Sequence, residues 1–209
     1  MPLLPLPDRA AWPPLRDDDL RILPAGALIF RVYKAGGRHP AQWSDFRRTG
    51  PLPAMGWDHH LPPPATGNDR SSWYGADHPD AALGESSSAT RVIDRVTDTA
   101  YLAVVAISRA LRLLSTDTGW PTRAGATLAI NAAPFDETQR WARAIYETYL
   151  DIEGIWYPSR INHGHYCVAL FERSSDALPP RAEDNRPLQD PLLDGDMRRA
   201  AARFNYRVR

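Results

Sequence analysis

A single carboxylate, Glu85, stands at the end of the stretch SSWYGADHPDAALGE, residues 71–85. Little side-chain bulk surrounds it, because Gly84 precedes it and the run 86–88 consists of three serines. Trp73 and Tyr74 stand upstream and could wall a pocket for a planar ring. A glutamate one or two turns into a helix is more often a solvated surface residue. The neighbourhood nevertheless makes Glu85 a candidate for a binding or catalytic carboxylate.

Two further polar residues interrupt apolar segments. Arg31 lies inside the strand-like run FRVY, and its side chain must either point outward or meet an anion, since burying an unpaired charge is costly. Ser159 follows Tyr157-Pro158 where a strand meets a turn, a place where most serines only cap the turn. No G-x-S-x-G sequence surrounds Ser159, which argues against a serine hydrolase.

Histidines form two groups, DHH at 58–60 and HGH at 163–165, that could in principle meet around a metal ion. Structural zinc sites usually pair cysteines at characteristic spacings, and Cys167 is the one cysteine of this chain. We therefore expect no metal site. The histidines are expected to support the surrounding loop by hydrogen bonds.

The composition indicates one ordinary domain. With 209 residues, of which 43% are hydrophobic, the chain can bury a single core. Its 25 basic and 25 acidic residues leave a formal net charge of zero, so no overall field attracts nucleic acid or anionic membrane. The proline-rich start lacks the basic and apolar regions of a signal peptide, and one cysteine agrees with a reducing cytoplasm. We therefore expect a soluble, cytoplasmic protein that binds neither nucleic acid nor membrane directly.

Strand and helix signals that do not alternate strictly predict an α+β fold. A long region, Lys34–Arg70, is irregular and rich in glycine and proline, and its aromatic residues favour packing over disorder. The predicted strands are Ala27–Tyr33, Ser72–Ala76, Arg91–Val96, Gly154–Tyr157 and Cys167–Phe171. The predicted helices are a short one capped by Asp77 that runs through Leu83, an apolar one at Thr99–Leu114, and one opened by a capping box at Asp136–Gln139.

Several of these segments occur together, in one order, in a known family. FRVY, HPAQWSDFR, WDHH, WYGADHPDAALGE, QRWARAIY, GIWYPSR and CVALFE resemble the RES domain family between Leu28 and Ala177. This family is named for its arginine, glutamate and serine, and its members act as toxins of bacterial toxin-antitoxin pairs. The resemblance implies one domain at 27–178, similar to the ADP-ribosyltransferase fold, with a long loop between its first two strands. Residues 1–26 would form an N-terminal extension, and 179–209 a C-terminal extension packed on or near the domain.

The resemblance also implies an activity. Characterised members consume NAD by phosphorolysis or hydrolysis, or transfer ADP-ribose to a protein, so NAD is expected as a substrate and no cofactor is expected. A protein antitoxin is the expected partner, and homo-oligomers are possible. The residues implied to line or shape the pocket are Arg31, Tyr33, His59, Tyr74, Glu85 and Ser159.

The expected roles follow from the chemistry of NAD. Breaking an N-glycosidic bond creates an oxocarbenium-like centre that a fixed carboxylate stabilises, which is a role for Glu85. Arginine presents a planar fork of donors that suits pyrophosphate, so Arg31 is expected to anchor the middle of the dinucleotide. Ser159 is expected to donate a positioning hydrogen bond.

Two positions depart from the family pattern. An arginine is expected before the aromatic-Asp-His-His segment, where this chain has Gly56, and many members carry an asparagine at the position of Cys167. Arg47, Arg48 or Arg70 could replace the missing arginine, or the activity could be weakened. Two alternatives to NAD phosphorolysis or hydrolysis therefore stay open: ADP-ribosyl transfer to a protein, and a non-catalytic binding module that has kept the fold.

Overall fold

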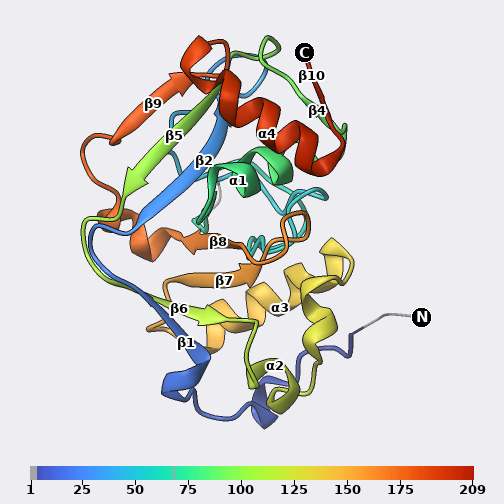
Figure 1. Ribbon diagram of the computed structural model, residues 1–209. Helices are drawn as coiled ribbons and strands as arrows, with labels where there is room; N and C mark the ends of the chain where they lie inside the picture. The colour runs from blue at the N-terminus through green and yellow to red at the C-terminus, as the bar shows by residue number, and fades with distance from the viewer. Residues whose placement is uncertain (1–3, 68) are drawn as a thin grey trace.

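The computed structural model describes residues 4–67 and 69–209. Eight strands in this part of the chain form one mixed sheet in the order β1-β6-β7-β8-β3-β2-β5-β9, and β4 (Val92–Ile93) and β10 (Arg207–Val208) form a small second sheet (Figure 1). β6 runs parallel to β7, whereas the other neighbours in the large sheet are antiparallel. The strands of the large sheet are β1 (Leu20–Leu23), β2 (Leu28–Lys34), β3 (Ser72–Ala76), β5 (Ala100–Ala106), β6 (Leu111–Ser115), β7 (Gly154–Pro158), β8 (Tyr166–Phe171) and β9 (Asp184–Pro187).

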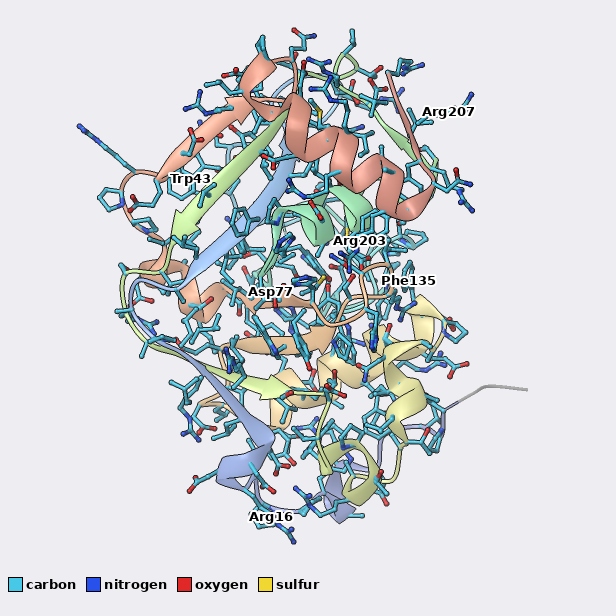
Figure 2. All side chains as sticks on the ribbon, in the orientation of Figure 1. Arg16, Trp43, Asp77, Phe135, Arg203 and Arg207 are labelled. Carbon is cyan, nitrogen blue, oxygen red and sulfur yellow. The ribbon has the colours of Figure 1, made fainter. Side chains whose placement is uncertain are left out.

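Helices cover one face of the large sheet in two groups. α1 (Pro79–Ser86) and α4 (Asp194–Phe204) share a buried cluster with β2, β3, β5 and β8. α2 (Trp120–Arg123) and α3 (Phe135–Thr148) share another with β6, β7 and β8. The opposite face carries a third cluster, covered by the loop residues Trp43 and Phe46 and by Ala177. Figure 2 shows side chains filling these layers, with Phe135 at the end of α3 that points toward α4.

Alternation along β2 decides which side chains meet the helices. β2 pairs with β5 from Leu28 opposite Ala106 to Lys34 opposite Ala100. Because successive side chains of a strand point to opposite faces, Phe30 and Val32 share the helix-covered face. Ile29, Arg31 and Tyr33 therefore point to the other face.

α1 is fixed at its start by a side-chain cap and along its length by small residues. His78, rather than the predicted Asp77, is the N-cap, and its Nδ1 accepts a hydrogen bond from the Asp80 backbone N–H at 3.2 Å. Asp77 instead accepts from the Tyr166 N–H at 3.0 Å, which ties the start of α1 to β8. Gly84 allows close packing on α4, since a Cβ there would lie 2.8 Å from the Phe204 ring.

The predicted helix at Thr99–Leu114 is wrong. This segment forms β5 and β6, which residues 107–110 connect, and neither strand is at the edge of the sheet. The run YLAVVA has residues buried on both faces of β5, including Leu102 and Ala103. A strand buried on both faces shows a continuous apolar run rather than alternation, so periodicity could not separate it from a buried helix.

The predicted strands at Ser72–Ala76, Gly154–Tyr157 and Cys167–Phe171 are confirmed within one residue, and Arg91–Val96 contains only the short β4. The third predicted helix is confirmed as α3, but Pro134 is its N-cap and no side chain caps it, so the predicted capping box is absent.

Both ends of the chain contribute to the sheet. β1 pairs with β6 before the predicted first strand begins, so the long loop lies between the second and third strands. β9 pairs with β5, and α4 packs on α1, so much of 179–209 is part of the same α+β unit. Neither LRIL nor DNRP carries a strong strand signal, and each is placed by its pairing partner. No helix within 4–67 or 69–209 is long and apolar enough to cross a membrane.

Candidate active site

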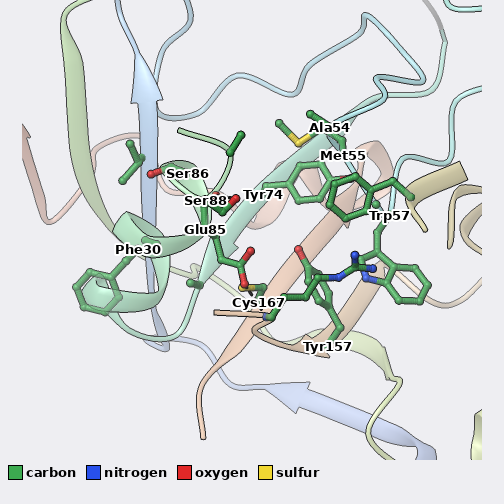
Figure 3. Close-up of a pocket in the computed structure, with 18 residues that line it drawn as sticks. Phe30, Ala54, Met55, Trp57, Tyr74, Glu85, Ser86, Ser88, Tyr157 and Cys167 are labelled. Carbon is green, nitrogen blue, oxygen red and sulfur yellow. Dashed lines mark hydrogen bonds between the residues drawn. The ribbon is translucent and has the colours of Figure 1, made fainter. Parts of the chain in front are cut away.

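A cavity of about 280 Å³ lies on the helix-covered face of the sheet. Side chains of β3, β7 and β8 contribute Tyr74, Tyr157 and Cys167, and α1 contributes Glu85. The long loop adds the segment 54–57, and α3 adds Phe135. Figure 3 shows the Glu85 carboxylate pointing from α1 toward Cys167 and Tyr157.

Glu85 lines this cavity and contacts Ser159, which does not line it, although 74 residues separate the two. The Ser159 hydroxyl donates to Glu85 Oε1 at 2.6 Å, and the Arg160 backbone N–H donates to the same oxygen at 2.7 Å. Ser159 Oγ also accepts from the backbone N–H groups of Ile161 at 3.2 Å and Asn162 at 2.9 Å. The turn after β7 therefore fixes the carboxylate at the end of α1.

These contacts also define what Ser159 can do. A hydroxyl has one proton to donate and two lone pairs to accept with, and all three are used here. The carboxylate that accepts the Ser159 proton also accepts the Arg160 N–H, which makes it a weaker base. These contacts favour a positioning role for Ser159 over a nucleophilic one.

Aromatic side chains form the flat walls of the cavity. The Tyr74 hydroxyl donates to Asp58 Oδ1 at 2.8 Å, and burial, followed by the charge of Asp58, raises the pKa of Tyr74 well above its usual value. Burial likewise raises the pKa of Tyr157 well above the usual phenol value, and its ring lies 5.7 Å from that of Trp57. Both phenols are neutral at physiological pH. The walls suit a planar, weakly polar ring.

Asp58 connects the long loop to this wall. Besides Tyr74, it accepts from the Leu52 backbone N–H at 2.9 Å and forms an ion pair with Arg47. The Asp58 side chain is fully buried, so these three partners compensate for the loss of its hydration. The loop therefore holds the cavity wall through a buried charge.

Arg31 and Tyr33 are not brought to this cavity. Arg31 lies on the opposite face of the sheet, where its Nη2 donates to the Asp45 carbonyl at 3.0 Å and its guanidinium lies 5.0 Å from the centre of the Trp73 ring. Burial lowers the pKa of Arg31 to about 10. Tyr33 donates to Asn185 Oδ1 at 3.0 Å on that same face. The sheet separates both side chains from Glu85, which does not support the predicted contact of Arg31 with the substrate, whereas Tyr33 lines a second hollow that adjoins this cavity.

His59 is fully buried and does not line the cavity. Its Nε2 lies 2.9 Å from Glu172 Oε2, and its Nδ1 lies 3.3 Å from Ser72 Oγ. Burial lowers the pKa of His59. Burial alone would raise the pKa of Glu172, but the hydrogen bonds that this carboxylate accepts, first the one from His59, outweigh burial and lower the pKa to about 2. The order serine-histidine-glutamate is that of a nucleophile relay, but Ser72 is only 2% exposed. The cluster joins the long loop to β3 and to the segment after β8.

Two further histidines, His78 and His165, are also engaged locally. His165 Nδ1 lies 3.3 Å from Asp77 Oδ1, and its ring lies 4.3 Å from that of His78. Within the described ranges, no three histidine, cysteine, aspartate or glutamate side chains are grouped so that they could hold a metal ion.

Sequence reasoning missed Phe135 and Arg160 as cavity residues. Arg160 follows Ser159 directly, so the YPSR segment carried the signal, whereas nothing local indicated that the start of α3 would reach the site. Cys167 also lines the cavity, and burial, then the charge of Glu85, raises the pKa of its thiol well above its usual value. Arg47, Arg48 and Arg70, the predicted substitutes for an arginine at position 56, do not line the cavity.

A second hollow of about 760 Å³ adjoins the first, with which it shares Val32, Met55 and Ser86. Its walls include β4, β10 and the Lys34 side of β2. The two hollows therefore lie next to each other.

The fold is that of an α+β protein in which one fixed carboxylate lines a cavity on the helix-covered face of the sheet. A model of the RES domain matches residues 28–192, most of the chain, and this protein belongs to the RES domain family. Among solved structures, it is similar to a chain in the crystal structure of the M. tuberculosis MbcT-MbcA toxin-antitoxin complex, with a TM-score of 0.57 and 15% sequence identity. That match covers 85% of this chain and 92% of the other. No curated protein matches the sequence.

Proposed function

We propose that this protein cleaves the nicotinamide-ribose bond of NAD and transfers the ADP-ribosyl group to phosphate or water. The observation that carries this proposal is the Glu85 carboxylate, held by the Ser159 hydroxyl and the Arg160 N–H inside an aromatic cavity. Membership in the RES domain family supports the same activity.

The chemistry needs little more than electrostatics and positioning. As the glycosidic bond breaks, its electron pair leaves with nicotinamide and positive charge develops on the ribose carbon. Glu85 lies at a fixed place where its charge can stabilise that centre, and no reorganisation is needed during the reaction. A phosphate or water oxygen then bonds to the ribose carbon, and an attacking water loses a proton to solvent.

The size of the cavity agrees with binding one half of the dinucleotide. A volume of about 280 Å³ lies just below the range of small-ligand sites, which is roughly 300–1,000 Å³. Nicotinamide and its ribose would occupy this cavity between Tyr74 and Tyr157. The adjoining hollow offers room for the remaining half.

We further propose that the protein is the toxin of a toxin-antitoxin pair. The related fold of known structure comes from such a complex. A protein antitoxin that covers the cavity would stop NAD loss, so expression alone should arrest growth and co-expression with the antitoxin should relieve it.

The test is chromatography of NAD and its products after incubation with purified protein, with and without phosphate. ADP-ribose 1-phosphate is the expected product with phosphate, and ADP-ribose is the product of hydrolysis. Glu85→Gln should lower turnover by about 100-fold or more, with much less change in NAD affinity. Equal turnover by a folded Glu85→Gln variant would refute the mechanism. An ADP-ribosyl adduct on a second protein would instead indicate a transferase, and NAD binding without turnover would indicate a binding module.

A further inference from the structure

Arg160 is the one cationic side chain among the described residues that line the Glu85 cavity. Its backbone N–H donates to Glu85, but its side chain turns to the start of α3. There Nη2 donates to the Ala133 carbonyl at 2.8 Å, and the guanidinium lies 4.5 Å from the centre of the Phe135 ring. These two contacts fix the plane and direction of the guanidinium.

The guanidinium has no carboxylate partner among the ion pairs of the described residues, whereas several surface arginines form such pairs. One of its nitrogens is engaged by Ala133, so further N–H donors remain for a ligand. Burial lowers the pKa of Arg160, but an arginine stays protonated at neutral pH. A partly desolvated cation, held in one orientation and lining a cavity, is suited to an oxyanion.

We infer that Arg160 binds a phosphate oxyanion beside Glu85. This inference rests on the proposed function and assigns to Arg160 the role that the sequence predicted for Arg31. The phosphate can come from the diphosphate of the dinucleotide or from the inorganic phosphate that accepts the ADP-ribosyl group. In both cases the anion lies in the cavity that the Glu85 carboxylate also lines.

Arg160→Gln and Arg160→Lys test the inference, with Arg140→Gln as the matched control. Arg140 lies on α3, where it pairs with Asp136 at 3.3 Å outside the cavity. Calorimetry on the full chain would compare ADP-ribose, which carries a diphosphate, with nicotinamide riboside, which carries none. A thermal midpoint for each variant shows that it is folded.

Arg160→Gln should weaken ADP-ribose binding by about 10- to 100-fold, as expected for loss of a charged hydrogen-bond donor pair. Nicotinamide riboside binding should change less than about twofold, and Arg140→Gln should leave both affinities unchanged. Arg160→Lys should recover part of the loss, since it keeps the charge without the fork. Equal losses for both ligands, or no loss for either together with an unchanged KM for phosphate, would overturn the inference.

Steady-state kinetics with varied phosphate separates the two sources of the anion. A higher KM for phosphate with unchanged ADP-ribose affinity assigns Arg160 to inorganic phosphate, and the reverse assigns it to the diphosphate. If the wild type never cleaves NAD but ADP-ribose affinity still depends on Arg160, the catalytic proposal fails and this inference stands. If Arg160→Gln cleaves NAD with unchanged KM for NAD and phosphate and binds ADP-ribose normally, this inference fails alone.

Discussion

Replacing Ser159 by alanine should affect the stability of the fold as well as the geometry of the site. The side chain makes one hydrogen bond to a carboxylate and accepts two from backbone N–H groups, and the residue is only 9% exposed. Hydrogen bonds to charged groups contribute about 1.5–3 kcal/mol each, and neutral ones about 1 kcal/mol. Because water from the cavity can replace some of these partners, we expect Ser159→Ala to lower the free energy of unfolding by about 3 kcal/mol.

For a chain of 209 residues, 1 kcal/mol corresponds to a shift of roughly 2–4 °C in Tm. Ser159→Ala should therefore lower Tm by about 6–12 °C. Ser174→Ala is the matched control, because Ser174 is fully buried and its hydroxyl makes one hydrogen bond, to the Phe171 carbonyl at 2.7 Å. The free energy of unfolding of the Ser174→Ala control should fall by about 1 kcal/mol.

A double-mutant cycle that combines Ser159→Ala with Glu85→Gln isolates the free energy of the contact between Ser159 and Glu85. Glutamine keeps an acceptor for Ser159 and the Arg160 N–H but loses the charge, so the coupling between the two positions should be about 1–2 kcal/mol. Urea unfolding measures the free energy of unfolding of the wild type, of each single variant and of the double variant. Ser159→Ala should also lower turnover more than nicotinamide riboside affinity. Coupling near zero, or equal destabilisation by Ser159→Ala and Ser174→Ala, would refute the view that Ser159 fixes Glu85.

Two further predictions concern the supports of the site. Tyr74→Phe should lower the free energy of unfolding, measured in urea, by about 1.5–3 kcal/mol, because it removes a hydrogen-bond donor from the buried Asp58 carboxylate. A decrease below about 0.5 kcal/mol would contradict this prediction. Burial lowers the pKa of His59 and of His78, so the folded state disfavours their protonated forms. The contribution of these two histidines to stability should be complete above about pH 6.5 and should be lost as the pH drops below that value. A thermal midpoint that stays constant from about pH 7.5 to about pH 5 would exclude this link between histidine protonation and stability.

The parts of the site that could be predicted from sequence are those with local signals. Ser72–Ala76 is bounded by turn residues and is rich in aromatics, and Pro79 marks the first turn of α1. Glu85 and Ser159 were identified through the family pattern, and their contact across 74 residues is a consequence of the tertiary fold. Arg160 adjoins Ser159, but its role depends on where α3 begins.

Arg31 shows the limit of the same reasoning. The strand was predicted within one residue, and alternation alone puts Arg31 and Tyr33 on one face. Which face of β2 meets α1 is decided by the packing of helices from distant parts of the chain, and no local pattern encodes it. The helix-covered side receives Phe30 and Val32 instead.

Gly56 and Arg160 are linked through Phe135. A Cβ at position 56 would lie 2.8 Å from Phe135 Cδ1, so a side chain there fits only if that ring moves. The same ring supports the Arg160 guanidinium at 4.5 Å. An arginine at position 56 and the present orientation of Arg160 are therefore competing arrangements of one cavity wall. Glycine in place of the expected arginine does not leave the wall without a positive charge, because the turn after β7 supplies Arg160 against the same ring.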